Sequence, residues 1–402
     1  MLNAFICDGI RTPFGRHAGS LSKVRPDDML GGVIKKIVSN CGLSPKKIDD
    51  VIVGCGNQAG EDSRCVARQA SLRAGLPIEI PGTVIQRNCG SGLGAIISGS
   101  HAITCGEADV LISGGVESMT RAPFVVAKAE EAFSKNILSF DSALGVRFPN
   151  PSIEQEFGYD SMPTTADNLA EEFNISRDDC DNFAYQSQKK YALAKKDGFF
   201  EHEILSVEIP VGKKDKSLKF EEDEFPRPDT EIGSLANLRP INAGGVTTPG
   251  NSSGINDGAV ALVMASKTQL GSFEHSLTCK ILASGVIGVE PRIMGYGPVP
   301  ASEIALRRAG LSISDMDVIE INEAFAAQVL ACLKGMKVDV YDSRVNPNGG
   351  AISIGHPLGA SGARIALTAA RQLERVGGRY ALVSMCIGMG QGIALVMERN
   401  NN

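Results

Sequence analysis

Two stretches far apart in the chain follow the same order of strand, glycine-rich turn, helix and strand. In the first third, an apparent strand at 83–88 leads through glycines into a helical stretch that stops at Gly106. Leu93 and Ile97 recur at helical spacing in that stretch, and a buried strand is predicted to follow at 109–115. The pattern is that of one α/β unit rather than of an all-helical or all-strand chain.

The last third repeats this unit. Residues 311–322 echo residues 43–54, and a later glycine-rich turn opens a helix with Ala363 on its apolar face. Gly377 ends that helix, and an apolar strand follows at 380–385. This weak internal duplication predicts an α/β fold built from two related halves, with parallel strands covered by helices.

The segment between the two repeats, roughly 123–250, is richer in charged and turn-forming residues. We interpret it as an insertion that lies over the two halves rather than as part of their sheets. Its Lys213, Lys214 and Lys216 are predicted to be solvated turn charges. The alternative is that these lysines contact the phosphate groups of a ligand.

Charge and hydropathy exclude several classes of function. The 402 residues include 40 basic and 46 acidic side chains, a net charge of −6, and no basic stripe of the kind that binds nucleic acid. No apolar run reaches the roughly 18 uncharged residues of a membrane span, and neither end resembles a signal peptide or a peroxisomal address. The ten cysteines are scattered without a CxxC pair. We therefore expect free thiols, a reducing cytoplasmic location and no metal site.

Cys89 has the most distinctive local setting, between a strand and a glycine-rich helix start at 86–96. Unpaired backbone N–H groups and the helix dipole are expected to lower the pKa of its thiol below the usual value of about 8.5. The alternative interpretation is a buried structural cysteine. That interpretation is kept for the cysteines that lack this setting, Cys7, Cys41, Cys55, Cys65, Cys105, Cys180, Cys279 and Cys332.

A nucleophilic cysteine needs a base, and His356 is the only histidine within a glycine-rich, nearly uncharged loop, at 346–365. A structural histidine at a helix start is the alternative. Cys386 repeats the order of strand, cysteine and glycine turn. Asn322 interrupts an apolar junction, where it caps a helix or donates to a developing oxyanion. Two thiols and one imidazole at the seam of two halves would suit acyl transfer with proton transfer at carbon.

Six segments spread over nearly the whole chain, in order, resemble the thiolases. These segments are QRNCGSGL (86–93), GGVESMTRAP (114–123), GNSSGINDGA (250–259), NEAFA (322–326), NPNGGAISIGHPLGASGAR (346–364) and CIGMGQG (386–392). The resemblance implies two duplicated α/β halves stacked as five layers, with a loop domain over the active site, in a homodimer or homotetramer. The corresponding boundaries are 1–122 and 251–277 for the N-terminal half, 123–250 for the loop domain and 278–402 for the C-terminal half.

The resemblance also implies a role for each site residue. Cys89 matches the acylated nucleophile, His356 its activating base, and Cys386 the acid/base at the α-carbon of acetyl-CoA. Asn322, with His356, matches the oxyanion hole of the thioester enolate, and the amides of Cys89 and Gly388 match the hole of the tetrahedral intermediate. Coenzyme A is then a substrate, with no further cofactor. The positions that match the lining of the pantetheine tunnel are Met162, Ser253, Met294, Ala324 and Phe325.

Within the family, the finer match is to thiolases that cleave 3-oxoadipyl-CoA, through segments such as IDDVIVGCGNQAGED (48–62) and RIMGYGPVPA (292–301). The chain departs from the usual family residues at Asn88, where Leu is common, and at Pro249 and Met389. These departures leave open an acetoacetyl-CoA thiolase and a general 3-ketoacyl-CoA thiolase.

Two further alternatives lie outside this specificity question. One is a decarboxylating condensing enzyme of the same fold, which Cys386 disfavours because such enzymes pair the nucleophile with His/His or His/Asn. The other is a non-catalytic acyl-CoA or lipid-binding protein. If the substrate carries a distal carboxylate, Arg147 is one candidate to bind it, although a surface role is the alternative.

Overall fold

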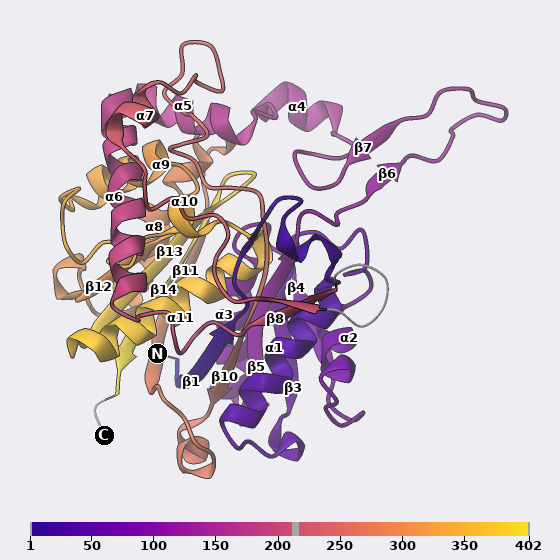
Figure 1. The fold of residues 1–402 in the computed structure, drawn as a ribbon, viewed down its shortest axis with the longest axis vertical. Helices are drawn as coiled ribbons and strands as arrows, with labels where there is room; N and C mark the ends of the chain where they lie inside the picture. Colours follow the sequence, from indigo (N-terminus) through magenta and orange to yellow (C-terminus); the bar gives the residue numbers. More distant parts are fainter. Residues whose placement is uncertain (1, 211–216, 401–402) are drawn as a thin grey trace.

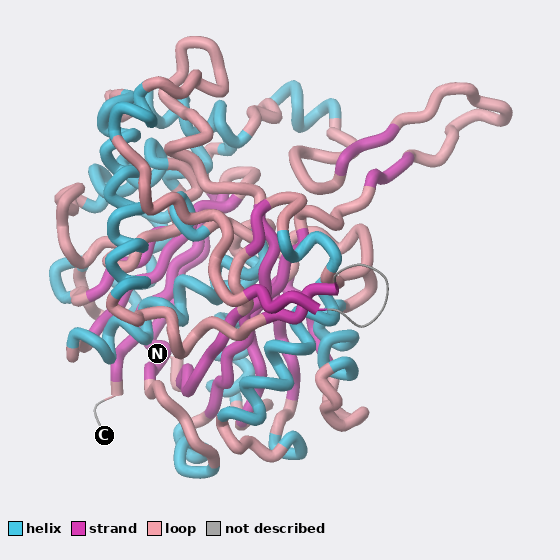
Figure 2. The backbone as a smooth tube through the Cα atoms, in the orientation of Figure 1, coloured by secondary structure: helices cyan, strands magenta, loops and turns pink. Residues whose placement is uncertain are grey.

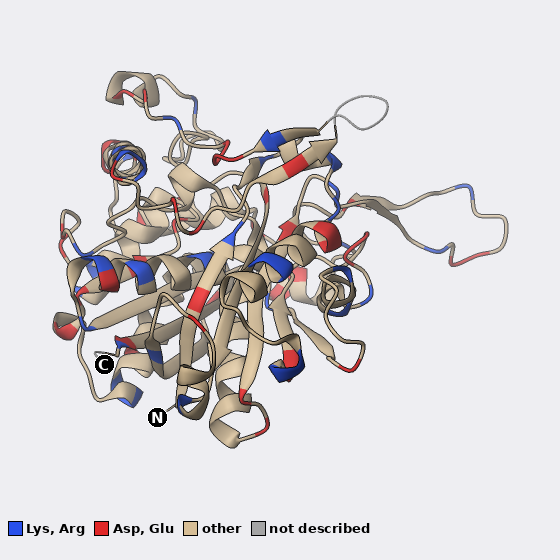
Figure 3. Cartoon of the chain, turned by 60° about the horizontal axis from the view of Figure 1, so that its bottom comes forward, with Lys and Arg blue, Asp and Glu red and all other residues tan. Residues whose placement is uncertain are grey.

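The computed structural model describes residues 2–210 and 217–400. Lys213, Lys214 and Lys216 fall outside these ranges, so their assignment as turn charges stays a prediction. Among the described residues, none of the helices is both long and apolar enough to cross a membrane. In the view of Figure 3, the ribbon positions of Lys and Arg are interspersed with those of Asp and Glu.

Ten strands form one mixed sheet. They are β1 (Ala4–Arg11), β2 (Gly15–Arg16), β3 (Asp50–Gly54), β4 (Gly82–Ile85), β5 (Val110–Ser118), β10 (Asn256–Ala265), β11 (Cys279–Gly288), β12 (Val318–Ile321), β13 (Tyr380–Ile387) and β14 (Gln391–Arg399). Their order is β12-β13-β14-β11-β1-β10-β5-β3-β4, with β2 paired to β10 (Figure 1). The halves are joined because β1 pairs antiparallel with β11, with Ala4 opposite Ile281.

The prediction of parallel sheets is only partly correct. Strand β3 runs parallel to β4 and β5, and β12 runs parallel to β13. The remaining pairs of the large sheet are antiparallel. The turn at residues 388–390 between β13 and β14 is the clearest case, since so short a connection can only join antiparallel neighbours.

The described α-helices are α1 (Pro26–Asn40), α2 (Val66–Arg73), α3 (Ser91–Cys105), α4 (Pro151–Phe157), α5 (Met162–Glu172), α6 (Arg177–Lys196), α7 (Ile232–Ala236), α8 (Pro298–Ala309), α9 (Ala326–Met336), α10 (Ala351–Ile354) and α11 (Leu358–Val376). Short 3-10 helices are η1 (Ser20–Lys23), η2 (Pro45–Lys47), η3 (Lys267–Ser272), η4 (Pro291–Tyr296) and η5 (Ile313–Asp315). The predicted helix stops at Gly106 and Gly377 are confirmed, since both adopt the left-handed conformation directly after α3 and α11.

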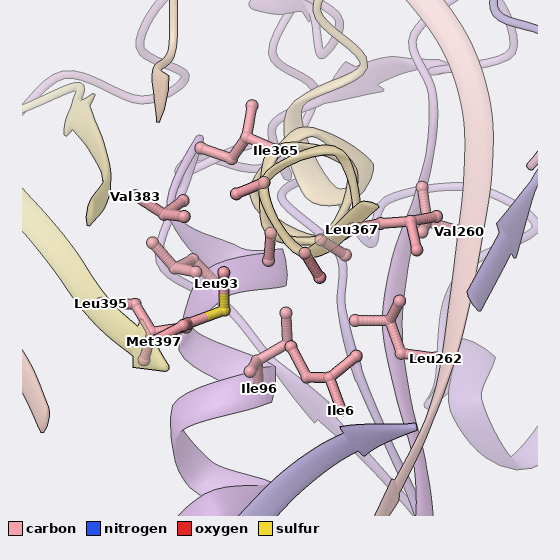
Figure 4. Packing of buried hydrophobic residues seen from close by; sticks show 14 of the residues in the cluster. Ile6, Leu93, Ile96, Val260, Leu262, Ile365, Leu367, Val383, Leu395 and Met397 are labelled. Atoms are coloured by element: carbon pink, nitrogen blue, oxygen red, sulfur yellow. The ribbon is translucent and has the colours of Figure 1, made fainter. Parts of the chain in front are cut away.

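Helices α3 and α11 form a central layer between the strands of the two halves. They contact each other, and α11 contacts both β5 and β13. Alternate residues of one strand point to opposite layers. Leu262 of β10 faces α3 and α11 (Figure 4), whereas Val263 belongs to the cluster that includes α1 and α2. In β14, Leu395 faces the central layer and Val396 faces the cluster that includes α8 and α9. These are the five layers that the resemblance implies.

Glycines allow the two central helices to approach closely at their first turns. A Cβ added at Gly92 of α3 would lie 2.5 Å from the carbonyl oxygen of Gly359 of α11. A Cβ at Gly362 would likewise clash with the backbone amide of Leu93. The backbones therefore meet without intervening side chains, and the residues just before both helices are brought toward one place.

The described strands of the middle segment pair with one another and not with the large sheet. Strand β6 (Phe124–Val126) pairs with β7 (Ser139–Asp141), and β8 (Val207–Pro210) pairs with β9 (Ser217–Phe220). The β6–β7 hairpin extends as an arm away from the rest of the molecule (Figure 2). Helices α4 to α7 lie in the same segment. The domain boundaries given above remain predictions.

Candidate active site

Cys89 lies in a tight turn between β4 and α3, two residues before the first residue of the helix. Asn88 has a positive φ of 44°, and the hydroxyl of Ser91 accepts from the Arg87 amide and donates to the Asn88 carbonyl, at 2.9 and 2.6 Å. A Cβ added at Gly90 would lie 2.5 Å from Cδ1 of Ile387. The turn that carries the thiol therefore packs directly on the second half of the chain.

The thiol of Cys89 is half-buried, and the Gly388 N–H donates a hydrogen bond to its Sγ. Burial nevertheless raises the pKa of Cys89 to about 11, because the loss of hydration outweighs the hydrogen bonds from this amide and its own. The expectation that the helix start lowers this pKa is therefore wrong. The resting nucleophile is a neutral thiol that needs a base.

His356 also precedes a helix by two residues, in the loop between α10 and α11, and its side chain is buried. Its Nδ1 lies 2.6 Å from Oγ of Ser361, which donates its own hydrogen to the Pro357 carbonyl at 2.9 Å. We therefore assign the proton to Nδ1 and the free lone pair to Nε2. The Asn256 side chain accepts from the His356 backbone amide at 2.9 Å and holds the loop.

The imidazole of His356 is neutral at physiological pH. Burial, reinforced by the positive charge of Arg364, lowers the pKa of His356 to about 4. With the proton on Nδ1, Nε2 is a proton acceptor. His356 can thus accept a proton from a neutral thiol as that thiol attacks a carbonyl group.

Cys386 lies on β13, and Asn322 directly follows the neighbouring strand β12, where its backbone amide donates to the Ser384 carbonyl at 3.0 Å. Burial, and then the nearby Cys89, hold the pKa of Cys386 well above its usual range. Asn322 is fully buried, and its Nδ2 lies 3.5 Å from Nε2 of His356. Within the described residues its Oδ1 has no hydrogen-bond partner.

These contacts bring all five predicted catalytic residues together. Cys89 contacts Gly388 and interacts electrostatically with Cys386, while Asn322 links the strand of Cys386 to His356. The residues come from the first half of the chain and from three separate segments of the second.

The residues that match the pantetheine tunnel lie beside this group. Ser253 donates its amide to the Ala324 carbonyl at 2.9 Å, and Met294 and Phe325 belong to the same buried cluster as Cys386. Met162 begins α5 and is 39% exposed, and a Cβ added at Gly388 would lie 3.7 Å from its sulfur. Met162 is therefore exposed to solvent and close to the turn that carries Gly388.

Glu117 has no role in the predictions from sequence, although it is a carboxylate within a fully buried strand. Its oxygens accept from the amides of Gly56, Asn57 and Gly359, at 2.8, 3.1 and 2.8 Å. Burial raises the pKa of Glu117 to about 7. One carboxylate thus joins the end of β3 to the first turn of α11, close to both Cys89 and His356.

Ser361 and Asn256 were also missed, although both lie in the segments that resemble the thiolases. Ser361 follows His356 by five residues, across the start of a helix, and this spacing could have predicted a hydrogen bond between the serine hydroxyl and the imidazole. Asn256 gave no such signal, because its contact joins residues 100 positions apart.

Arg147 lies on the loop between β7 and α4, where its Nη1 donates to Oδ1 of Asn57 at 3.0 Å. Asn57 in turn binds the carboxylate of Glu117. The thiol of Cys55, the Asp62 carboxylate and the Glu117 carboxylate form one buried group. The Cys55 sulfur and one carboxylate oxygen of each acid lie within 4.8 Å of one another.

Comparison with known proteins agrees with this geometry. The family models "Thiolase, N-terminal domain" and "Thiolase, C-terminal domain" match residues 4–268 and 275–399. The chain is 53% identical over 401 residues to the 3-oxoadipyl-CoA/3-oxo-5,6-dehydrosuberyl-CoA thiolase of Escherichia coli (strain K12), covering 99% of this chain and 100% of that protein. It is 50% identical over 401 residues to a beta-ketoadipyl-CoA thiolase of Acinetobacter baylyi, with the same coverage.

Among solved structures, human mitochondrial 3-ketoacyl-CoA thiolase superposes with a TM-score of 0.91 at 38% sequence identity, covering 100% of this chain and 99% of that one. The predicted fold class is thereby confirmed.

Proposed function

Because the chain belongs to the thiolase family, we propose that it cleaves 3-oxoadipyl-CoA with coenzyme A to give succinyl-CoA and acetyl-CoA. Relatives whose names state this substrate are 50 to 53% identical over almost the whole chain, which supports the choice. The meeting of Cys89, His356, Cys386, Asn322 and Gly388 at one place carries the chemical part of the proposal. We include no resident cofactor, and coenzyme A acts as substrate.

The first step forms an acyl-enzyme. As the sulfur of Cys89 attacks the 3-keto carbon, Nε2 of His356 takes the thiol proton, and the amides of Cys89 and Gly388 donate to the new oxyanion. The C2–C3 bond then breaks, and its electron pair becomes the enolate of acetyl-CoA. The protonated His356 and Nδ2 of Asn322 donate to the enolate oxygen.

The second step moves a proton to carbon and regenerates the enzyme. Cys386 protonates the enolate carbon, and a thiol whose pKa is raised suits this transfer because the accepting carbanion is a strong base. After acetyl-CoA leaves, the Cys386 thiolate takes the proton of the incoming coenzyme A thiol, which attacks the acyl group on Cys89. The Cys89 sulfur departs and recovers its proton from His356.

A panel of substrates tests the specificity. We expect kcat/KM to be at least tenfold higher for 3-oxoadipyl-CoA than for 3-oxohexanoyl-CoA, which has the same chain length without the carboxylate, and than for acetoacetyl-CoA. Equal or better use of the neutral esters would identify a general or acetoacetyl-CoA thiolase. Mass spectrometry should detect a succinyl adduct on Cys89, and a chain that turns over no ester and forms no adduct would be a binding protein.

We also propose a homodimer or homotetramer located in the cytoplasm. The β6–β7 arm supports assembly, because it exposes large apolar side chains, including Phe133 at 99% and Ile137 at 78%. The ten cysteines are all free among the described residues, which fits a reducing compartment. Light scattering after size exclusion gives the assembly size, and a monomer would contradict the proposal.

A further inference from the structure

Asn88 connects the two halves of the molecule next to the nucleophile. Its Nδ2 donates to the carbonyl oxygen of Gly388 at 3.2 Å. Its Oδ1 accepts from Nε2 of Gln86 at 3.0 Å, and the same Gln86 nitrogen donates to the Gly56 carbonyl at 3.2 Å. Both ends of the amide are therefore engaged, and Gln86 fixes which end points toward Gly388.

The residue that Asn88 holds presents an amide to the reacting sulfur. The N–H of Gly388 donates to Sγ of Cys89, whereas its carbonyl belongs to the next peptide unit. Gly388 lies in the turn between β13 and β14 and has no Cβ, so sterics alone leave its two flanking peptide planes free to rotate. A contact on the carbonyl fixes the second of these planes and, because both planes share the Gly388 Cα, limits how far the N–H can turn.

We propose that Asn88 is a positioning residue that clamps the Gly388 peptide, so that the Gly388 N–H stays directed at Cys89 and at the oxyanion that forms there. This inference rests on the proposed thiolase chemistry at Cys89. It assigns a function to the residue at which the chain departs from the Leu usual in the family, since a leucine side chain can neither donate to the carbonyl nor accept from Gln86.

Asparagine suits the backbone of this position as well as its contacts. The φ of 44° places Asn88 in the left-handed region, which Asn tolerates better than other non-glycine residues. A second side-chain contact, from Nη1 of Arg87 to Oε1 of Gln391 at 3.4 Å, joins the same two segments without touching Gly388. The chain thus supplies a matched contact that should serve the packing of the halves and not the amide.

The test compares Asn88→Gly, which keeps the left-handed backbone, with Gln391→Ala. We expect Asn88→Gly to lower kcat about tenfold, part of the 10²- to 10³-fold cost of losing one oxyanion donor, while KM for coenzyme A changes less than twofold. Gln391→Ala should keep kcat within twofold. Equal kcat values for Asn88→Gly, Gln391→Ala and wild type would overturn the inference, whereas an inactive wild-type enzyme would overturn the proposed function instead.

A second readout separates positioning from general loosening of the site. Because the Gly388 N–H lowers the pKa of Cys89, its misalignment should move the pH profile of Cys89 alkylation by iodoacetamide to higher pH in Asn88→Gly. Should Asn88→Gly fail to fold, the isosteric Asn88→Asp, which cannot donate to the carbonyl, replaces it in the kinetic comparison. An unshifted alkylation profile together with wild-type kcat would leave Asn88 a packing residue and reject the clamp.

Discussion

The first turns of α3 and α11 occupy matching places in the two halves, yet they carry different chemistry. Cys89 and His356 each stand two residues before their helix. The strand ends match too, because Gly54 pairs with Gly115 and Ile321 with Ser384, so Glu117 and Cys386 each lie two residues beyond the paired position. Duplication thus brings equivalent positions to one site, where they carry different groups. The helix starts carry the nucleophile and the base, and the strand ends carry a structural carboxylate and a proton donor.

The largest effects should come from the two helix starts. Cys89→Ala should lower kcat by about 10⁴-fold or more and abolish the acyl adduct, because no other group carries the acyl chain. His356→Ala should lower kcat about 10³-fold and still allow slow adduct formation in single turnovers. If mass spectrometry detected the same amount of acyl adduct in both variants, the assignment of Cys89 as nucleophile and His356 as base would be wrong.

The matching strand ends predict a different contrast. Cys386→Ala should reduce steady-state cleavage about 10³-fold and abolish deuterium exchange at the α-carbon of acetyl-CoA, while the acyl adduct on Cys89 persists. Glu117→Gln should keep this exchange but lower the free energy of unfolding by about 1–3 kcal/mol, because its amide nitrogen cannot accept from the backbone. Chemical denaturation and proton NMR measure the two effects. Loss of exchange in Glu117→Gln with unchanged stability would contradict the comparison.

The pH dependence distinguishes the resting state found here from a preformed thiolate. The pKa of Cys89 is raised to about 11 and that of His356 is lowered to about 4, so both groups stay neutral between these values. The rate of Cys89 alkylation should therefore keep rising about tenfold per pH unit up to roughly pH 11. A plateau starting near pH 8.5, measured by mass spectrometry of the Cys89 peptide, would restore the expectation from sequence.

The smallest effect concerns the tautomer of the base. Ser361→Ala removes the acceptor of the Nδ1 proton, so we expect kcat to fall about tenfold and the folding stability to change by about 1 kcal/mol. Ser361→Thr retains a hydroxyl and serves as the control. If Ser361→Ala matches the wild type in kcat, the assignment of the free lone pair to Nε2 loses its support.

The sequence predicted the helices and strands around the site better than the pKa of the thiol within it. Local patterns located β5, α3 and α11 with their glycine stops, because spacing and capping act over a few residues. The thiol pKa was missed, since burial is a tertiary effect: the turn that carries Cys89 packs on Ile387 from the other half, about 300 positions away. The mixed direction of the sheet was missed for the same reason, because strand pairing is set by tertiary contacts.

The contact of Gly92 with Gly359 has a consequence for how this protein can change. Nucleophile and base each stand just before one of the two central helices, and between Gly92 and Gly359 no side chain separates the backbones of those helices. A single added methyl group there would spread the two helices and lengthen the proton path between sulfur and imidazole. The distance between the Cys89 sulfur and the His356 imidazole therefore depends on glycines, which have no functional group at all.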